Sequence, residues 1–142
     1  DIVVLPYPAH GVKLYGNVII ASPKLIAENP QAIKAFLSAF TKGIKEVMAN
    51  PDPAIDYVKA RDGIINVDLE KRRLRMAIDA VVASPDARAE GFGVVNPARL
   101  ALMASQVSDA FATKTRVDPS AVWTDRLLPP KAELNVLPPL RR

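Results

Sequence analysis

Residues 12–21, Val-Lys-Leu-Tyr-Gly-Asn-Val-Ile-Ile-Ala, are centred on an apolar, β-branched triplet at positions 18–20. A short continuous apolar run of this kind is typical of a strand that is covered on both faces of a sheet. A second such run, Ile-Val-Val-Leu at positions 2–5, ends at a proline, which cannot donate to a central ladder. The sequence therefore predicts two strands, over about residues 2–5 and 14–21.

The residues that follow carry helical patterns instead. Ser22-Pro23 and Asn29-Pro30 each place a capping side chain directly before a proline, which is typical of a helix N-terminus. We expect a short helix over residues 23–29 and a long one over residues 30–49. Apolar side chains recur along the long helix at intervals of three and four residues and predict one buried stripe. The stripe consists of Ile33, Phe36, Leu37, Phe40, Ile44, Val47 and Met48.

Three further helices are expected downstream. They cover about residues 53–60, residues 68–83 with Asp68 as the capping residue, and a stretch that begins after Asn96. The last of these has a predicted inward face made of Leu100, Met103, Val107 and Phe111. The final residues, 129–142, are rich in proline and are expected to be extended.

The charge pattern gives little support to a nucleic-acid partner. Over 142 residues, 19 Lys and Arg oppose 15 Asp and Glu, for a formal net charge of +4. The densest basic run, residues 70–75, alternates with apolar positions of a predicted helix, as on a solvated helix face. It lacks the interleaved aromatic residues on which bases would stack. We therefore expect no nucleic acid among the partners.

The residues that most often carry catalysis or hold metals are scarce. The chain has no cysteine, which removes disulfides, thiolate metal sites and cysteine nucleophiles from this sequence. His10 is its one histidine, so neither a Ser-His-Asp triad within the chain nor a paired-histidine metal site is expected. We predict no catalytic residue, no metal ligand and no cofactor.

The two predicted strands do not suffice for a stable sheet, because an isolated pair of strands is at best marginally stable in water. Both lie before residue 23, and helices follow. The chain also begins at Asp1 rather than at a methionine. We therefore expect the chain to be the carboxy-terminal part of an α/β protein whose other strands lie upstream.

An ordered series of short motifs runs along the chain. It comprises Asp1-Ile-Val-Val-Leu-Pro-Tyr7, residues 11–22, Glu28-Asn29-Pro30, residues 35–43, residues 62–65, Arg73-Leu74-Arg75, Gly91-Phe92-Gly93, Pro97-Ala-Arg-Leu100 and Trp123-Thr-Asp-Arg-Leu-Leu-Pro129. In this order the motifs resemble the carboxy-terminal half of the periplasmic substrate-binding proteins of ABC importers for nitrate, sulfonates, taurine and thiamine pyrimidine precursors. The resemblance covers about residues 1–130.

The resemblance implies an α/β, periplasmic-binding-protein-like fold of two lobes. The chain would be its mostly helical carboxy-terminal fragment, with about two strands at the start. Residues 1–11 would end the second lobe, and residues 12–22 would form a crossing, or hinge, strand. Residues 23–128 would be the helical carboxy-terminal part of the first lobe with its wrapping helices, and residues 129–142 a proline-rich tail.

The same resemblance implies the function of a solute-binding component. Such a protein captures a small molecule (a sulfonate, nitrate, taurine or a pyrimidine-like compound) between its lobes and is not an enzyme. Its partners would be the ligand, an ABC permease in the membrane and the missing amino-terminal half of the same protein. Its location would be periplasmic or extracytoplasmic, associated with the membrane through the permease.

The crossing segment supplies the candidate ligand-binding residues, Tyr15, Gly16 and Asn17. A tyrosine stacks on or hydrogen-bonds a small ligand, and an asparagine offers both a donor and an acceptor. Gly16 lets the backbone approach closely. The alternative is that Tyr15 and Asn17 satisfy backbone groups of the hinge.

Two other functions stay open at this point. One is an enzyme on the same scaffold that makes the thiamine pyrimidine; the branch that does so carries a cysteine-containing iron motif, which this chain lacks. The other is a helical interaction module.

Overall fold

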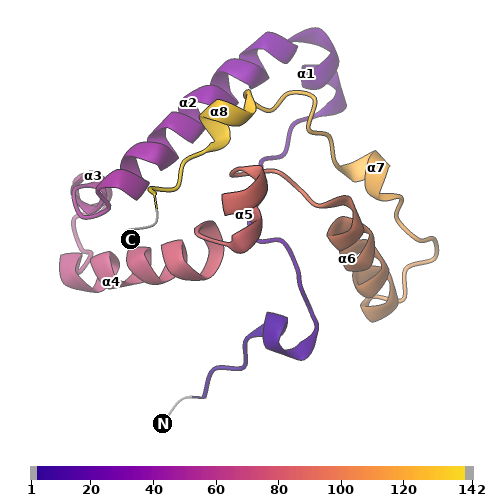
Figure 1. Ribbon diagram of the computed structural model, residues 1–142, viewed down its shortest axis with the longest axis horizontal. Helices are drawn as coiled ribbons and strands as arrows, with labels where there is room; N and C mark the ends of the chain where they lie inside the picture. The colour runs from indigo at the N-terminus through magenta and orange to yellow at the C-terminus, as the bar shows by residue number, and fades with distance from the viewer. Residues whose placement is uncertain (1–2, 140–142) are drawn as a thin grey trace. The chain divides into compact units, whose positions relative to one another are not determined.

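A computed structural model describes residues 3–139, which form helices joined by irregular segments (Figure 1). The chain divides into two compact units. Unit 1 holds the residues up to Ala21 together with Val95–Arg126, and unit 2 holds Ser22–Val94 together with the residues from Leu127 onward. The predicted boundaries after residues 11, 22 and 128 concern lobes, which this division does not test, so they stay predictions.

The bounds of the elements follow the chain order. Unit 1 contains the 3-10 helix η1 (Tyr7–His10), α6 (Pro97–Ala110) and α7 (Pro119–Val122). Unit 2 contains α1 (Pro23–Glu28), α2 (Pro30–Ala49), α3 (Ala54–Arg61), α4 (Val67–Ala77), the π-helix η2 (Ile78–Val82), α5 (Pro85–Glu90) and α8 (Lys131–Leu134).

The two predicted strands are wrong, and with them the α/β fold class. Residues 3–21 contain η1 and otherwise irregular backbone, and no strand occurs anywhere between residues 3 and 139. Residue 2, where the first strand was expected to begin, lies outside the described residues. A strand needs a neighbouring ladder, and β-branched residues alone do not provide one. Val18, Ile19 and Ile20 expose 59%, 45% and 87% of their surface, so the predicted buried strand is an exposed segment.

The predicted helix starts are largely confirmed, because capping is a local interaction. Ser22 Oγ accepts a hydrogen bond from the backbone N–H of Leu25 at 3.1 Å, and this fixes the start of α1. At α4 the capping residue is Asn66 rather than Asp68, since its Oδ1 accepts from the N–H of Leu69 at 3.0 Å. Asp68 lies in the first turn, where its negative charge suits the positive end of the helix dipole.

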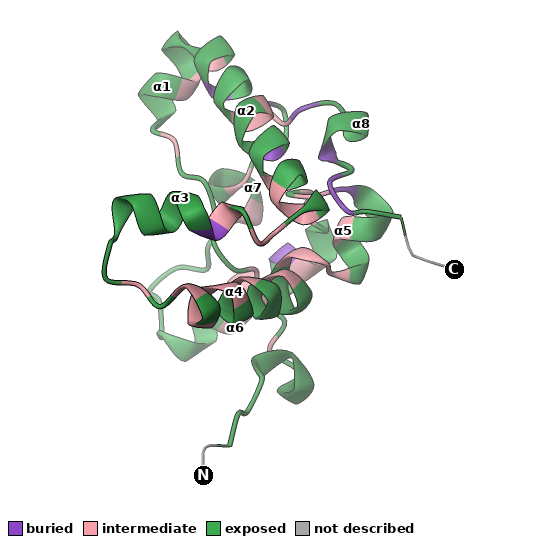
Figure 2. Cartoon of the chain, turned by 90° about the vertical axis from the view of Figure 1, so that its left-hand side faces the viewer, coloured by how far each residue is buried: buried purple, intermediate pink, exposed green. Residues whose placement is uncertain are grey.

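The long predicted helix is α2, and its apolar stripe is only partly buried (Figure 2). Ile33 is buried, whereas Phe36 and Phe40 expose 55% and 41% of their surface. The two rings stack with centroids 6.2 Å apart, and the Phe40 ring stacks in turn on that of Phe92 at 6.5 Å. The stripe thus forms an aromatic row at the surface of unit 2 as well as a core contact.

The carboxy-terminal segment is not simply extended. It forms α8, which lies beside α2 (Figure 1), and it supplies much of the buried apolar surface of unit 2. The buried side chains are Leu127, Leu134, Val136 and Leu137. Main-chain and side-chain hydrogen bonds hold it: Phe92 N–H donates to the Leu134 carbonyl at 2.8 Å, and Ser38 Oγ donates to Glu133 Oε2 at 3.0 Å. Residues 140–142 of the predicted tail lie outside the described residues.

Candidate ligand site in unit 1

Tyr15 is the predicted ligand-binding residue whose position the structure defines best. The backbone N–H of Asn96 donates to its hydroxyl oxygen at 2.8 Å. The backbone N–H of Tyr15 points at Met103 Sδ, 3.4 Å away. The guanidinium carbon of Arg99 lies 4.3 Å from the centroid of its ring, within the range of a cation–π contact. The hydroxyl, the backbone and one face of the ring are therefore all held.

The backbone before Tyr15 is held by α6, the helix that carries Arg99 and Met103. Arg99 Nε donates to the Lys13 carbonyl at 3.0 Å, and its Nη2 donates to the Leu14 carbonyl at 2.8 Å. Gln106 Nε2 donates to the Gly11 carbonyl at 3.3 Å. Side chains of α6 thus bind carbonyl groups of residues 11–14, which lie before or at the start of the predicted second strand.

The four residues that hold the segment share one face of α6 and its cap; we call them the α6 clamp. Asn96, Arg99, Met103 and Gln106 follow one another at intervals of three, four and three, which brings them onto the same side of a helix. Asn96 also caps the helix, because its Oδ1 accepts from the N–H of Arg99 at 3.1 Å. The first turn of α6 therefore provides three contacts: the cap between Asn96 and Arg99, the hydrogen bond from Asn96 to the Tyr15 hydroxyl, and the contact of Arg99 with the Tyr15 ring.

The other two predicted ligand residues, Gly16 and Asn17, follow the clamped segment directly and are exposed. Tyr15 itself is half-buried. Its hydroxyl accepts a hydrogen bond from a backbone group, while part of its surface stays accessible. The roles of Tyr15, Gly16 and Asn17 toward a ligand stay predictions.

The predicted inward face of α6 is only partly confirmed. Leu100 is buried and Met103 is half-buried, but Val107 and Phe111 are exposed. Ser108 is buried instead, and α6 ends two residues later, at Ala110. The clamp itself was not predicted, and its only signal in the sequence was the run of polar and sulfur-containing residues at helical spacing.

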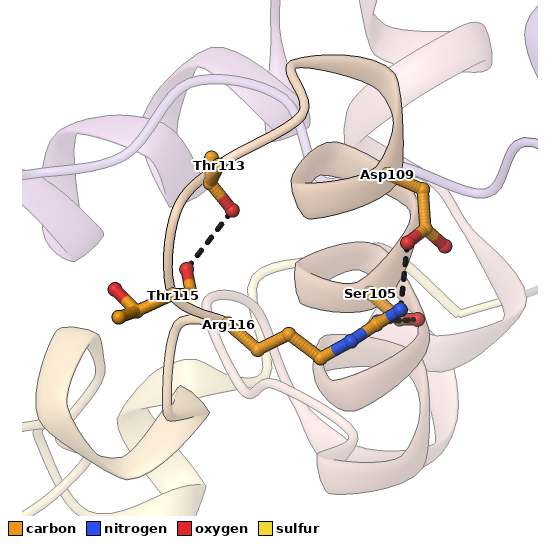
Figure 3. A network of polar contacts seen from close by, with 5 residues as sticks. All are labelled: Ser105, Asp109, Thr113, Thr115 and Arg116. Carbon is orange, nitrogen blue, oxygen red and sulfur yellow. Dashed lines mark hydrogen bonds and ion pairs between the residues drawn. The ribbon is translucent and has the colours of Figure 1, made fainter.

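The carboxy-terminal half of α6 is held by a second arginine, Arg116 (Figure 3). Its Nη1 donates to Ser105 Oγ and its Nη2 pairs with Asp109 Oδ1, both at 2.7 Å. In the loop between them, Thr113 Oγ1 donates to the Thr115 carbonyl at 2.9 Å. This network ties the loop after α6 back onto the helix.

The carboxyl group of Asp118 in unit 1 has a lowered pKa, and the cause is helix capping. Asp118 Oδ1 accepts from the hydroxyl of Ser120 at 2.8 Å and from its backbone N–H at 2.9 Å. Both bonds favour the charged form and lower the pKa of Asp118 below its ordinary value. The shift belongs to the start of α7.

Unit 2 contains a small hollow and a set of exposed ion pairs. The hollow, of about 230 Å³, lies between α5 and α8 and is lined by Arg88, Glu90 and Lys131 among others. Lys131 Nζ is 3.5 Å from Glu90 Oε2, so charges at its rim already face each other. In the basic run, Arg73 pairs with Glu70 at 2.6 Å and Arg75 with Asp52 at 2.7 Å; both arginines are exposed and both carboxylates belong to half-buried residues.

Two negative findings concern the described residues alone. Between residues 3 and 139, no group of three or more His, Cys, Asp and Glu side chains is placed to hold a metal ion. Within the same range, no helix is long and apolar enough to cross a membrane.

Comparison with known proteins found matches to parts of the chain. A family model described as NMT1/THI5 like matches residues 1–54, a stretch that includes Tyr15, Gly16 and Asn17. The riboflavin-binding protein RibY of Chloroflexus aurantiacus is 42% identical over 43 residues, which are 30% of this chain and 12% of that protein. No solved structure matches significantly. These matches cover short stretches and support a likeness to a substrate-binding family.

Proposed function

We propose that this chain is part of the solute-binding component of an ABC importer and that Tyr15, Gly16 and Asn17 contact the transported small molecule. One observation carries the proposal: the family match over residues 1–54 includes the segment that the α6 clamp holds in place. A binding site gains affinity when its contact groups are ordered before the ligand arrives.

The three residues have complementary chemistry. The Tyr15 ring offers an aromatic surface for stacking. Asn17 is exposed beside it and offers both an amide donor and a carbonyl acceptor. Gly16 has no side chain, so a ligand can reach the backbone between them. Together they suit reversible recognition, which needs no covalent step, and we propose a binding protein rather than an enzyme.

Among the proposed ligands, a compound with a flat heterocyclic ring fits this segment better than a small anion. The resemblance found in the sequence allows a sulfonate, nitrate, taurine or a pyrimidine-like compound, and the name of the RibY relative adds riboflavin. A small anion would require free cationic donors, whereas two donors of Arg99 are bound to backbone carbonyls. A heterocycle requires an aromatic face, which Tyr15 has.

The wider assignment follows from the importer role. The partners would be a membrane permease of the ABC class and the further polypeptide that completes the binding protein, and the location would be periplasmic or extracytoplasmic. The match to RibY covers 12% of that protein, so the remaining ligand contacts would come from residues outside this alignment.

The test is a ligand panel on the full-length protein. A native mass spectrum first identifies any co-purified small molecule, and calorimetric titration then compares riboflavin, a thiamine pyrimidine precursor, taurine and nitrate. We expect saturable, one-to-one binding of a heterocyclic compound and none of nitrate. Binding of nitrate or taurine alone would overturn the ligand class, and no binding of any member would count against the solute-binding role.

A further inference from the structure

We infer that Arg99 is a positioning residue of this ligand site: it acts on the ligand only through Tyr15, by fixing the plane of the tyrosine ring. The inference rests on the proposed function, because it assigns a role within the same site. It goes beyond that function by assigning a role to a residue of α6, outside the segment that the family model matches.

The geometry defines what Arg99 controls. Its guanidinium carbon lies 4.3 Å from the Tyr15 ring centroid, so the cation covers one face of the ring. The same guanidinium binds the carbonyls of Lys13 and Leu14, which directly precede the tyrosine. One side chain therefore holds both the ring and the backbone that carries it, which a contact to the ring alone would not achieve.

The remaining fixed point of the ring is its hydroxyl group, which accepts a hydrogen bond from the N–H of Asn96 at 2.8 Å. Asn96 and Arg99 are joined by the helix cap at 3.1 Å, so both contacts depend on the same turn of α6. With one face under the guanidinium and the hydroxyl bound, a stacking ligand would take the opposite face of the ring. A ring that is already held loses little freedom when the ligand stacks on it.

Arginine is required at this position, and lysine would not replace it. The guanidinium is planar and has several donors in a fixed arrangement, so it can lie flat on a ring while it binds two carbonyls. A lysine ammonium is compact and has no such plane. The conservative variant Arg99→Lys therefore keeps the charge and loses the positioning, which separates the two effects.

The experiment compares Arg99→Ala and Arg99→Lys with the wild type in the full-length protein, with riboflavin as the probe. The matched control is Arg116→Ala, which removes another arginine from the same unit together with its bonds to Ser105 and Asp109, neither of which belongs to the segment 11–15. We expect both Arg99 variants to bind riboflavin about threefold to tenfold more weakly, the usual range for one side chain that must be newly ordered. We expect the control variant to bind it unchanged.

A second measurement follows Tyr15 without any ligand. Carbon-13 labelling of tyrosine gives ring signals, and Tyr15→Phe identifies the one that belongs to Tyr15. In the Arg99 variants this signal should move toward the position of a mobile, exposed tyrosine, while Arg116→Ala should leave it in place. A thermal melt of each variant checks that the protein is folded.

The outcomes separate the inference from the function on which it rests. If Arg99→Lys binds riboflavin as tightly as the wild type does and its Tyr15 signal is unmoved, the positioning role is overturned, although the proposed function stands. An equal loss of affinity in Arg116→Ala would also overturn it, because the effect would then be general. If the wild type binds no member of the ligand panel, the proposed function fails, and the Tyr15 signal alone still decides whether Arg99 orients the ring.

Discussion

Gly91 and Leu134 lie so close together that a Cβ atom at position 91 would be 2.9 Å from the Cβ of Leu134. Gly91 ends α5 with a φ of +112°, a backbone conformation that residues with a side chain rarely adopt. The next residue, Phe92, donates its N–H to the Leu134 carbonyl at 2.8 Å. The glycine therefore permits the close approach by which α8 and the segment around it complete the core of unit 2.

Gly91→Ala should therefore destabilise the protein. The substitution adds backbone strain at positive φ and forces Leu134 away, at a combined cost of about 2–5 kcal/mol. Chemical denaturation measures the loss. The control is Gly43→Ala in α2, where nothing lies within 4 Å of the added methyl group. It should stabilise the protein by up to about 1 kcal/mol, because alanine is the better helix former. Equal stability of the two variants would contradict this packing.

Ala112→Gly should raise stability, because α6 ends in a Schellman motif with an alanine at the left-handed position. Ala112 has a φ of +47°, its N–H donates to the Asp109 carbonyl at 3.3 Å, and the Thr113 N–H donates to the Ser108 carbonyl at 3.1 Å. Glycine removes the steric cost, for a net gain of about 0.5–1 kcal/mol.

The matched control is Ala101→Gly, at an exposed position inside the same helix, where glycine should cost about 1 kcal/mol. Thermal melts of both variants check the opposite signs. A loss of stability in Ala112→Gly as large as that in Ala101→Gly would show that position 112 is not left-handed in solution.

Ile20→Ala tests the correction of the fold class. If residues 18–20 formed a buried strand, the substitution would cost about 2–5 kcal/mol. Because Ile20 exposes 87% of its surface, we expect a change within about 0.5 kcal/mol. Leu134→Ala, at a buried position, should cost the full 2–5 kcal/mol or so and serves as the reference in the same denaturation series. A large loss in Ile20→Ala would restore the strand.

The titration of Asp118 provides a prediction for low pH. Its folded-state pKa lies below the ordinary value of 3.8, chiefly because the Ser120 hydroxyl donates to it. The contribution of this cap to stability is therefore present above the unfolded pKa and is lost as the pH falls through the folded one. Carbon-13 detection of the carboxyl group should give a midpoint below 3.8. In Ser120→Ala the midpoint should move back up; an unchanged midpoint would show that the hydroxyl is not the main cause.

The parts of the fold that depend on local interactions were predictable from the sequence. Ser22-Pro23 and Asn29-Pro30 mark helix starts, since a cap involves only residues within one turn. The irregular backbone of residues 14–21 was not predictable, because a strand depends on a distant partner, and its absence cannot be read from a local apolar run. The burial of Leu134 depends on a gap at Gly91, 43 positions earlier, which no local pattern reports.

In the candidate site, too, local features were predictable from the sequence and contacts between distant residues were not. Tyr15, Gly16 and Asn17 were selected because a resemblance and their chemistry pointed to them. Arg99 was not selected, because it and Leu14 are 85 positions apart in the chain. The cap at Asn96 predicted where α6 begins, but only the folded structure shows that this turn meets the tyrosine.

Calorimetric titration of Asn17→Ala in the full-length protein, with the compound identified by the ligand panel, tests the central claim most directly. Asn17 is exposed in the described structure, so its replacement should leave the melting temperature unchanged. It should weaken binding by about 1–3 kcal/mol, the cost of leaving a polar group of the ligand unpaired. Leu134→Ala should do the reverse, lowering the melting temperature and leaving the affinity of the folded protein intact. If Asn17→Ala binds as tightly as the wild type, residues 15–17 are not the ligand site.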